Sequence, residues 1–454
     1  METLILSKNL KSLGTYSFGQ NLNLHSIYFR SPAPPVCGNP ITTTAFPDDF
    51  VAYVPKGSLE AYKNASDWSF LPRNFKEYEP EDDIAPDWYT SKDYSRDGKV
   101  ELLQRASEGN GIDIVLMGDA FSDRQIADGT YGRVIAKMKD AFFSVEPYKS
   151  FQHLFNVYSV DVVSQSEGYA HPGQALGTVF KGGTEVAGND DACMGYARHA
   201  LSDDRMDNAL ILVAMDSTAY AGTCYMYSSS TYSGDWGEGT SVAYFPLGTT
   251  EETLAKLVHH EAGGHGFAKL ADEYAYESNG AIPEEAVNDV LRQESYGWNK
   301  NVDFTSDPTM VKWSHFLTDA RYHYDGLGCF EGACTYWKGV WRPTENSIMR
   351  DNTGGFNAPS REAIWYRIHK LAYGSSWEYD YEEFVAYDAI NRKASESTSS
   401  ARSRRLAPVY PPLAPPVVIN RRWNDPIPRK QEASRREESR PMAPNKLLGP
   451  VKTR

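Results

Sequence analysis

Three short, mostly apolar runs constrain the fold of this chain more than any other feature. They cover residues 112–117, 155–163 and 209–215, the last reading ALILVAM, and polar residues or glycines interrupt the chain around them. Apolar runs of this length are typical of strands that are buried on both faces. A helical pattern at 131–143 follows the first run, so the sequence predicts a mixed α/β domain, with residues 241–245 as an edge strand.

Composition divides the 454 residues into four segments. The last 60 residues hold 10 of the 26 prolines and few aromatic side chains, so they bury too little apolar surface to offset their ordering entropy. We expect most of this tail to be disordered, although its residues 413–418 are compatible with a strand of some further domain. The predicted segments are an N-terminal module at 1–80, an acidic linker at 81–97, a main domain at 98–390 and a largely disordered, Pro/Arg-rich tail at 391–454.

The N-terminal module carries apolar residues at a repeat-like spacing: Leu10, Leu13, Phe18, Leu22, Leu24 and Ile27. This spacing resembles the BspA-like leucine-rich repeats of bacterial surface proteins, and residues 53–71 resemble the segment that closes such an array. Repeats normally need about three neighbours to bury a continuous core. We therefore expect a terminal cap or the end of a longer array, which implies a role in docking to a surface or partner; the alternative is an ordinary small β-rich domain.

The charge distribution restricts the partners of the protein. The formal net charge is -14, yet residues 395–454 contain 13 Lys and Arg against 5 Asp and Glu, so the folded body is more acidic than the whole chain. An acidic body argues against nucleic acid as the main partner. No apolar run reaches the roughly 18 residues of a membrane-spanning helix, so we expect no membrane-spanning segment.

The cysteines and the N-terminal residues give information on the cellular compartment of the protein. The five cysteines allow the pairs Cys329–Cys334 and Cys193–Cys224, but a buried thiol is the commoner state of a lone cysteine. The first residues, METLILSKNLKSLG, contain no signal peptide. The protein is therefore either cytosolic or longer at its N-terminus than this chain, and we expect the natural product to extend beyond Met1.

The stretch HHEAGGH at 259–265 is the strongest indication of chemistry. A catalytic zinc takes three protein ligands and keeps one position open for water, and the usual helical motif places two histidines four residues apart, with a glutamate as base. Here His260 and His265 are five residues apart, which is a rotation of roughly 140° on a regular α-helix. A widened π-turn would bring the two rings together, and Gly263 and Gly264 hinder it least. We expect this turn late in a helix at about 250–270, capped by a Thr249–Glu252 capping box.

Residues outside this motif complete the predicted site. A short HE..H match arises by chance in many proteins, and its histidines are then ordinary surface or hydrogen-bonded residues. Asp272 and Glu273 follow the helix closely enough to supply a third ligand, and ENSIMRDN places Met349 where it could underlie the metal or simply fill the core. We assign Asp272 as the third ligand and leave Glu273 as the alternative; the carboxylate that does not bind metal is expected to orient a ligating histidine.

These motifs resemble a known family. HEAGGHGFAKLADEY and EGACTYWKGVWRPTENSIM, supported by IVLMGDAFSD and NAPSREAIWYRI, are similar to the Bacteroides-type members of the IgA-peptidase family of zinc metallopeptidases. The resemblance covers about residues 98–390 and implies a metzincin-like, two-lobed α/β catalytic domain. It implies that His260, His265 and Asp272 bind Zn²⁺ and that Glu261 is the general base. The metzincin pattern would place the third ligand at Ala271, which cannot bind metal, so the sequence departs from it there.

The expected function is hydrolysis of peptide bonds in protein substrates, immunoglobulin or other extracellular proteins included, outside the cytoplasm or in the periplasm or at the cell surface. Tyr274, Arg342 and Arg350 are candidate oxyanion donors among which the sequence does not choose. Tyr220 is a candidate for the substrate rim, and Asp119 is expected to cap a turn. The alternatives are a surface adhesin on a peptidase-like scaffold, or a metal-dependent amidase or sugar-processing hydrolase.

Overall fold

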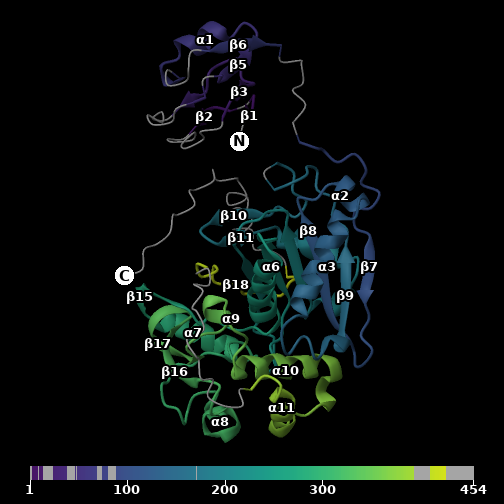
Figure 1. Ribbon diagram of the computed structural model, residues 1–454, viewed down its shortest axis with the longest axis vertical. Coiled ribbons are helices and arrows are strands. Elements are labelled where there is room, and N and C mark those ends of the chain that lie inside the picture. Colours follow the sequence, from purple (N-terminus) through teal and green to yellow (C-terminus); the bar gives the residue numbers. More distant parts are fainter. Residues whose placement is uncertain are drawn as a thin grey trace, which may run out of the picture. The chain divides into compact units, whose positions relative to one another are not determined.

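The chain divides into two compact units in a computed structural model (Figure 1), residues Met1–Asp87 and Trp88–Arg454. The structure describes residues 3–8, 10–13, 24–37, 46–47, 49–68, 74–79, 88–169, 171–392 and 410–425. None of the helices in these ranges is both long and apolar enough to cross a lipid bilayer.

The N-terminal unit is built on a parallel four-stranded sheet in the order β1-β3-β5-β6. Its core includes Leu24 and Ile27, which pack with Phe29. Of the predicted repeat positions, Phe18 and Leu22 lie outside the described residues, and the identity of the unit as a leucine-rich-repeat cap stays a prediction. The elements are β1 (Thr3–Leu6), β2 (Ser12–Leu13), β3 (Ser26–Phe29), β4 (Val36–Cys37), β5 (Val51–Pro55), α1 (Leu59–Asn64), η1 (Ser66–Trp68) and β6 (Phe75–Tyr78).

The second unit contains a mixed seven-stranded sheet in the order β18-β13-β14-β12-β8-β9-β7. The four strands β14, β12, β8 and β9 run parallel to one another, whereas β13 and β7 run antiparallel to their neighbours β14 and β9. This confirms the predicted mixed α/β class. The strands are β7 (Val100–Gln104), β8 (Ile112–Asp119), β9 (Phe155–Val160), β12 (Leu210–Met215), β13 (Thr223–Tyr227), β14 (Ser241–Pro246) and β18 (Val417–Ile419).

Each predicted buried run is a strand of this sheet. All six residues of β12 are buried, and alternate residues point to opposite faces, so both faces are covered by apolar side chains. The predicted strand at 241–245 is not an edge strand: β14 lies between β12 and β13 and is buried along its whole length, because β13 covers its outer side. Tyr244 and Phe245 of this strand face the two cores.

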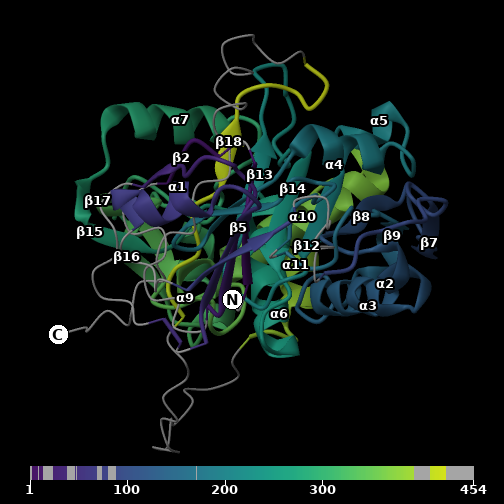
Figure 2. The same cartoon turned by 90° about the horizontal axis from the view of Figure 1, so that it is seen from above.

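Helices cover both faces of the sheet, as Figure 2 shows. One core brings the sheet together with α3 (Thr130–Phe142), α6 (Glu251–Leu257), the helix η3 (Val258–Phe267) and α10 (Ala358–Tyr373). The other core lies under α4 (Asp190–Ala197) and α5 (Asp203–Met206). The predicted helix at 131–143 is thus confirmed as α3, and its buried residues include Ile135 and Met138.

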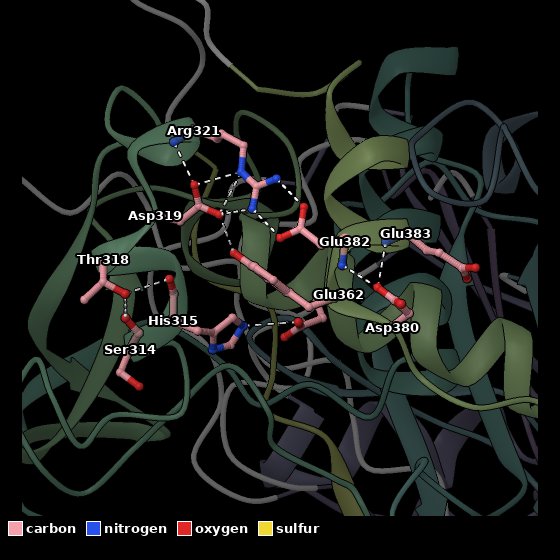
Figure 3. Close-up of polar contacts among 10 residues, drawn as sticks. Ser314, His315, Thr318, Asp319, Arg321, Glu362, Asp380, Glu382 and Glu383 are labelled. Atoms are coloured by element: carbon pink, nitrogen blue, oxygen red, sulfur yellow. Dashed lines mark hydrogen bonds and ion pairs between the residues drawn. The ribbon is translucent and has the colours of Figure 1, made fainter.

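The residues after η3 form a smaller layer that returns to the sheet through α10. Its short helices are joined to α10 and α11 by polar contacts (Figure 3): His315 Nε2 lies 3.1 Å from Glu362 Oε1, and Arg321 pairs with both Asp319 and Glu382. The remaining elements are α2 (Asp123–Ala127), η2 (Gln152–Leu154), β10 (Val179–Gly182), β11 (Glu185–Ala187), β15 (Ala275–Ala281), α7 (Glu284–Glu294), α8 (Ser314–Thr318), η4 (Ala320–Tyr322), β16 (Leu327–Ala333), β17 (Thr335–Thr344), α9 (Ile348–Asp351), η5 (Gly374–Ser376) and α11 (Tyr381–Asp388).

The segment boundaries differ from the predicted ones at two places. Residues 88–97 pack on the second unit instead of linking the two, since Ser91 donates a hydrogen bond to Ser164 O and Arg96 pairs with Asp161; residues 81–87 lie outside the described residues. In the predicted tail, residues 410–425 are ordered and contribute β18 to the main sheet, where its parallel pairing to β13 supplies backbone hydrogen bonds. They therefore belong to this unit and not to a further domain, while 393–409 and 426–454 lie outside the described residues.

Neither of the two disulfides that the sequence allows is formed. Cys193 and Cys224 are buried thiols, and Cys329 and Cys334 are half-buried thiols. The commoner expectation, a buried thiol that packs as a small apolar side chain, is therefore the one that the structure supports.

Candidate metal centre

The helix that carries the histidine motif begins at Thr250 and changes its winding at Val258. The side chain of Thr250 accepts a hydrogen bond from the backbone N–H of Thr253 at 3.1 Å and so caps α6. The predicted Thr249–Glu252 capping box is wrong by one residue, because the third residue after this cap is Thr253. From Val258 to Phe267 the chain continues as a π-helix, η3.

The π-helix places the two histidines of the motif on one face. In a π-helix, backbone hydrogen bonds join residues five apart, which is the spacing of His260 and His265. Their ring centroids lie 4.9 Å apart at an interplanar angle of 80°. The predicted widening of the helix is thus confirmed, and it extends over ten residues rather than one turn.

Asp272 returns to the two histidines from the loop after the helix. Its Oδ1 lies 3.3 Å from His260 Nε2 and 3.2 Å from His265 Nε2. The three donor atoms all lie within 4.8 Å of one another, and all three side chains are buried. Two imidazole nitrogens and one carboxylate oxygen are the donor types of catalytic zinc sites.

The far side of each ring is fixed by the backbone. His260 Nδ1 lies 2.9 Å from the carbonyl oxygen of Ile348, and His265 Nδ1 lies 2.8 Å from that of Leu270. A carbonyl oxygen can only accept, so each Nδ1 carries the proton and donates it. In the neutral ring this leaves a lone pair on Nε2 that faces the centre, which is the tautomer that a metal ligand requires.

The acceptors at this centre have no donor among the protein's described groups. His260 Nε2, His265 Nε2, both carboxylate oxygens of Asp272 and both of Glu261 are buried and make no hydrogen bond within the described part of the chain. Burying acceptors without a partner costs roughly 1–3 kcal/mol each. A divalent cation bound by these groups would remove this cost, so the residues present fit a metal ion.

The carboxylates of the centre differ in their electrostatics. Burial acts against ionisation of Asp272, but His265 and His260 hold the pKa of its carboxyl below the usual value. Burial raises the pKa of Glu261 to about 8, and the nearby charge of Asp272 adds to this effect. Glu261 can therefore hold a proton near neutral pH, whereas Asp272 is ionised and available as a ligand.

Glu273, the alternative third ligand, points away from the triad. Its carboxylate accepts hydrogen bonds from Asn301 Nδ2 at 2.8 Å, Ser347 Oγ at 2.7 Å and Asn357 Nδ2 at 2.9 Å. None of these partners is a histidine, so the expectation that the second carboxylate orients a ligating ring is wrong: backbone carbonyls orient both rings. Glu273 instead joins three loops behind the site, and the sequence analysis missed its three partners because isolated Asn and Ser residues give no spacing signal.

Met349 lies directly under the π-helix. It is fully buried in α9, one residue after the carbonyl group that holds His260. A Cβ atom added to Gly264 would lie 2.2 Å from Met349 Sδ and 2.8 Å from its Cε. Gly264 is therefore required for the close approach of the methionine to the turn between the two histidines.

Gly264→Ala is expected to lower the free energy of unfolding by about 1–3 kcal/mol, because the added methyl group overlaps a buried side chain. Thermal and denaturant unfolding of the metal-free chain measure this loss. Gly132→Ala is the matched control: Gly132 lies in α3 with open space around its Cα and should gain up to about 1 kcal/mol. In a chain that also carries Met349→Ala, Gly264→Ala should lower the free energy of unfolding by less. An equal loss with and without Met349 would contradict the contact between residue 264 and Met349.

Of the three candidate oxyanion donors, one borders the centre. Burial and then the charges of Asp272 and Glu261 raise the pKa of the Tyr274 hydroxyl, so this group lies close to both carboxylates. Arg342 instead donates to the backbone carbonyls of Glu331 and Gly332, and Arg350 donates to Asn346 Oδ1. These two arginines have structural contacts away from the triad.

The structure also shows the positions of Tyr220, predicted for the substrate rim, and of Asp119, predicted to cap a turn. Tyr220 lies within the electrostatic reach of Glu261, and its hydroxyl accepts a hydrogen bond from Asn352 Nδ2 at 3.1 Å. Asp119 is fully buried and accepts hydrogen bonds from the backbone N–H groups of Leu176 and Thr178. It therefore organises a loop, as expected, and does not line the centre.

A mixed α/β unit with a buried His-Glu-His helix and a converging carboxylate is typical of metal-dependent hydrolases. Residues 100–322 match the model of the family described as IgA Peptidase M64. Residues 100–322 therefore form a domain of this family of metallopeptidases, and a peptidase acts on proteins or peptides. A comparison with curated proteins gave no match.

Proposed function

We propose that this protein is a zinc-dependent endopeptidase that hydrolyses peptide bonds of protein substrates, with Glu261 as general base. The observation that carries the proposal is the convergence of His260 Nε2, His265 Nε2 and the Asp272 carboxylate, three buried acceptors without a donor in the described part of the chain. Imidazole nitrogen suits zinc, and three protein ligands leave one position for water.

Three side chains would hold the zinc ion, and the backbone keeps two of them oriented. The Ile348 and Leu270 carbonyls fix the rings of His260 and His265. When bound, zinc would supply Lewis acidity and lower the pKa of a water molecule to about 7. Asp272 contributes the negative charge that offsets part of the charge of the ion.

Glu261 would move the proton between the two halves of the reaction. Glu261 directly follows His260, a proposed ligand, so its carboxylate would be placed to take the proton of the water that attacks the peptide carbonyl. The carboxyl would then carry that proton until the leaving amine takes it. Tyr274, which lies close to both carboxylates, is the candidate donor to the oxyanion.

We also propose a metzincin-like arrangement and an action on extracellular proteins. The contact between Met349 and Gly264 supports the first, since the methionine lies under the turn that joins the two histidines. The third ligand is offset by one residue from the metzincin position, from Ala271 to Asp272. The extracellular location rests on the family resemblance and is tested by assaying the secreted and cellular fractions of the natural source for the protein.

Metal removal tests the proposed function. Purified full-length protein is expected to contain about one zinc ion per chain by elemental analysis and to cleave an unfolded protein such as reduced casein. A chelator should abolish the cleavage, and added zinc should restore it, because no other described group of the site polarises the peptide carbonyl as strongly.

Three results would contradict this proposal. A folded chain that takes up no zinc when zinc is supplied would leave the site without a metal function. Cleavage that continues at full rate after the metal has been removed would place the chemistry elsewhere. Turnover of small amides without any cleavage of casein or peptides would instead favour an amidase.

A further inference from the structure

The described part of the C-terminal tail contacts residues that border the candidate metal centre. The hydroxyl of Tyr274 donates a hydrogen bond of 2.7 Å to the carbonyl oxygen of Leu413, 139 residues further along the chain. Leu413 is only 2% exposed and packs into the main core. The tail thus touches a tyrosine that lies close to the third proposed ligand.

A second contact covers the side of the general base. The rings of Tyr220 and Tyr410 stack with centroids 4.4 Å apart, and Tyr220 lies within the electrostatic reach of Glu261. Tyr410 also lies under Lys256, whose Nζ is 4.9 Å from the ring centroid. With the tail in this place, Glu261 is fully buried, although a general base has to meet its substrate.

Beyond the centre the tail binds as an added strand. Strand β18 pairs with β13, from Tyr225 opposite Val417 to Tyr227 opposite Ile419, and covers what would otherwise be the edge of the sheet (Figure 2). Before this strand, the hydroxyl of Thr184 donates a hydrogen bond of 3.0 Å to Pro412 O. An extended peptide held by an exposed strand and by side-chain pockets is a general mode of peptide recognition.

The tail is anchored after this strand. Asp207 accepts a hydrogen bond from Trp423 Nε1 at 2.9 Å and pairs with Arg422, while Arg421 lies 3.3 Å from Asp191. Four of the six residues at 411–416 are proline, so this stretch loses little conformational entropy when it is held extended. A pre-extended segment tethered at its end is present at a high effective concentration.

We propose that residues 410–419 occupy the substrate cleft as a tethered peptide ligand, and that the cleft takes extended, proline-rich segments with an apolar residue at the place of Leu413. Substrates of this class then compete with the chain's own tail, which keeps the enzyme in a low-activity state. The proposal rests on the proposed function, because only a peptidase would bind substrate in this cleft. The binding test, however, does not depend on hydrolysis.

A peptide-exchange experiment on the full chain tests this. The probe is a fluorescein-labelled peptide with the sequence of residues 408–425, and the protein is the zinc-loaded Glu261→Gln chain, which is not expected to cut the probe. Leu413→Ser in this chain removes the buried apolar contact of the tail, so the probe should bind at least tenfold more tightly than to the chain with Leu413. Leu102→Ser is the matched control: Leu102 is 37% exposed in β7, at the opposite edge of the sheet from β18, so the same change there should leave the affinity unchanged.

Activity gives the second measurement. In the chain with Glu261, Leu413→Ser should raise kcat/KM on a fluorogenic proline-containing peptide at least tenfold, mainly by lowering KM, and the unlabelled 408–425 peptide should inhibit competitively. Tyr410→Ala removes the ring stacking with Tyr220 and the contact with Lys256, and it replaces Leu413→Ser if that variant does not fold.

The outcomes separate this proposal from the proposed function. Equal probe binding to the chain with Leu413 and to the Leu413→Ser variant, with both folded, would overturn the occupancy of the cleft even if the enzyme is active. Tighter probe binding to the Leu413→Ser variant without hydrolysis by any variant would support the tethered ligand and overturn the peptidase. Tighter probe binding to the Leu413→Ser variant together with a gain in its kcat/KM supports both the tethered ligand and the peptidase function.

Discussion

Glu261→Gln is expected to lower kcat/KM by about 10²–10⁴ while leaving one zinc ion per chain in place. The glutamine keeps the size and the buried position of the side chain, but it cannot accept a proton from water. None of the proposed zinc ligands is changed, since these are His260, His265 and Asp272. The measurements are kcat/KM on a fluorogenic peptide and zinc content by elemental analysis on the same preparation.

The control for this prediction is a glutamate on the same helix. Glu252 in α6 has a side chain that is 79% exposed and pairs with Lys256 at 3.2 Å. Glu252→Gln makes the same chemical change away from the centre and should alter kcat/KM by less than about twofold, since an exposed pair of this kind contributes little. If the activity of the Glu261→Gln variant stays within tenfold of the wild type, Glu261 is not the group that transfers the proton.

The histidine spacing predicts the local backbone because few conformations satisfy it. Two imidazoles five residues apart reach one metal ion only on a widened helix, and the adjacent Gly263 and Gly264 make that widening possible. The structure shows this π-helix, with Gly264 packed against Met349. The buried strands are predictable for a similar reason, since a run such as that of β12 is too apolar to lie anywhere but in the core.

The position of the carboxylates is not predictable from spacing. Asp272 and Glu273 are neighbours, and which of them faces the histidines depends on the backbone after η3. There Lys269 adopts a φ of 56°, in the left-handed region that lysine rarely enters, and the chain turns back at this residue. The groups that orient the rings, the carbonyls of Leu270 and Ile348, belong to every residue and leave no mark in a sequence.

The tail shows where composition fails as a predictor. Its overall content of proline and charge predicts disorder, yet residues 410–425 are ordered, contribute β18 to the main sheet and contact Tyr274 beside the centre. Their partners lie far away in sequence: Tyr220 stacks on Tyr410, and Tyr274 donates to Leu413. Averages over a long tail cannot detect a short segment whose stability comes from an existing sheet edge.

His265→Ala is expected to abolish stoichiometric zinc binding and, with it, peptide hydrolysis. Loss of a group that only orients a ligand costs about 10–100-fold in metal affinity, so loss of a ligand itself should cost more than about 100-fold. Zinc content by elemental analysis and the zinc-dependent rise in the melting temperature measure this, because a metal that binds only the folded chain stabilises it.

Substitutions of the two neighbouring carboxylates decide the third ligand. Asp272→Asn should lose the zinc-dependent rise in melting temperature. Without metal its amide can donate to an imidazole Nε2, so the metal-free variant should melt no lower than the metal-free wild type. Glu273→Gln should lower stability, because Glu273 accepts from Asn301, Ser347 and Asn357, but it should keep the zinc. Retention of zinc by Asp272→Asn together with its loss in Glu273→Gln would reverse the assignment and require the loop after η3 to rearrange when metal binds.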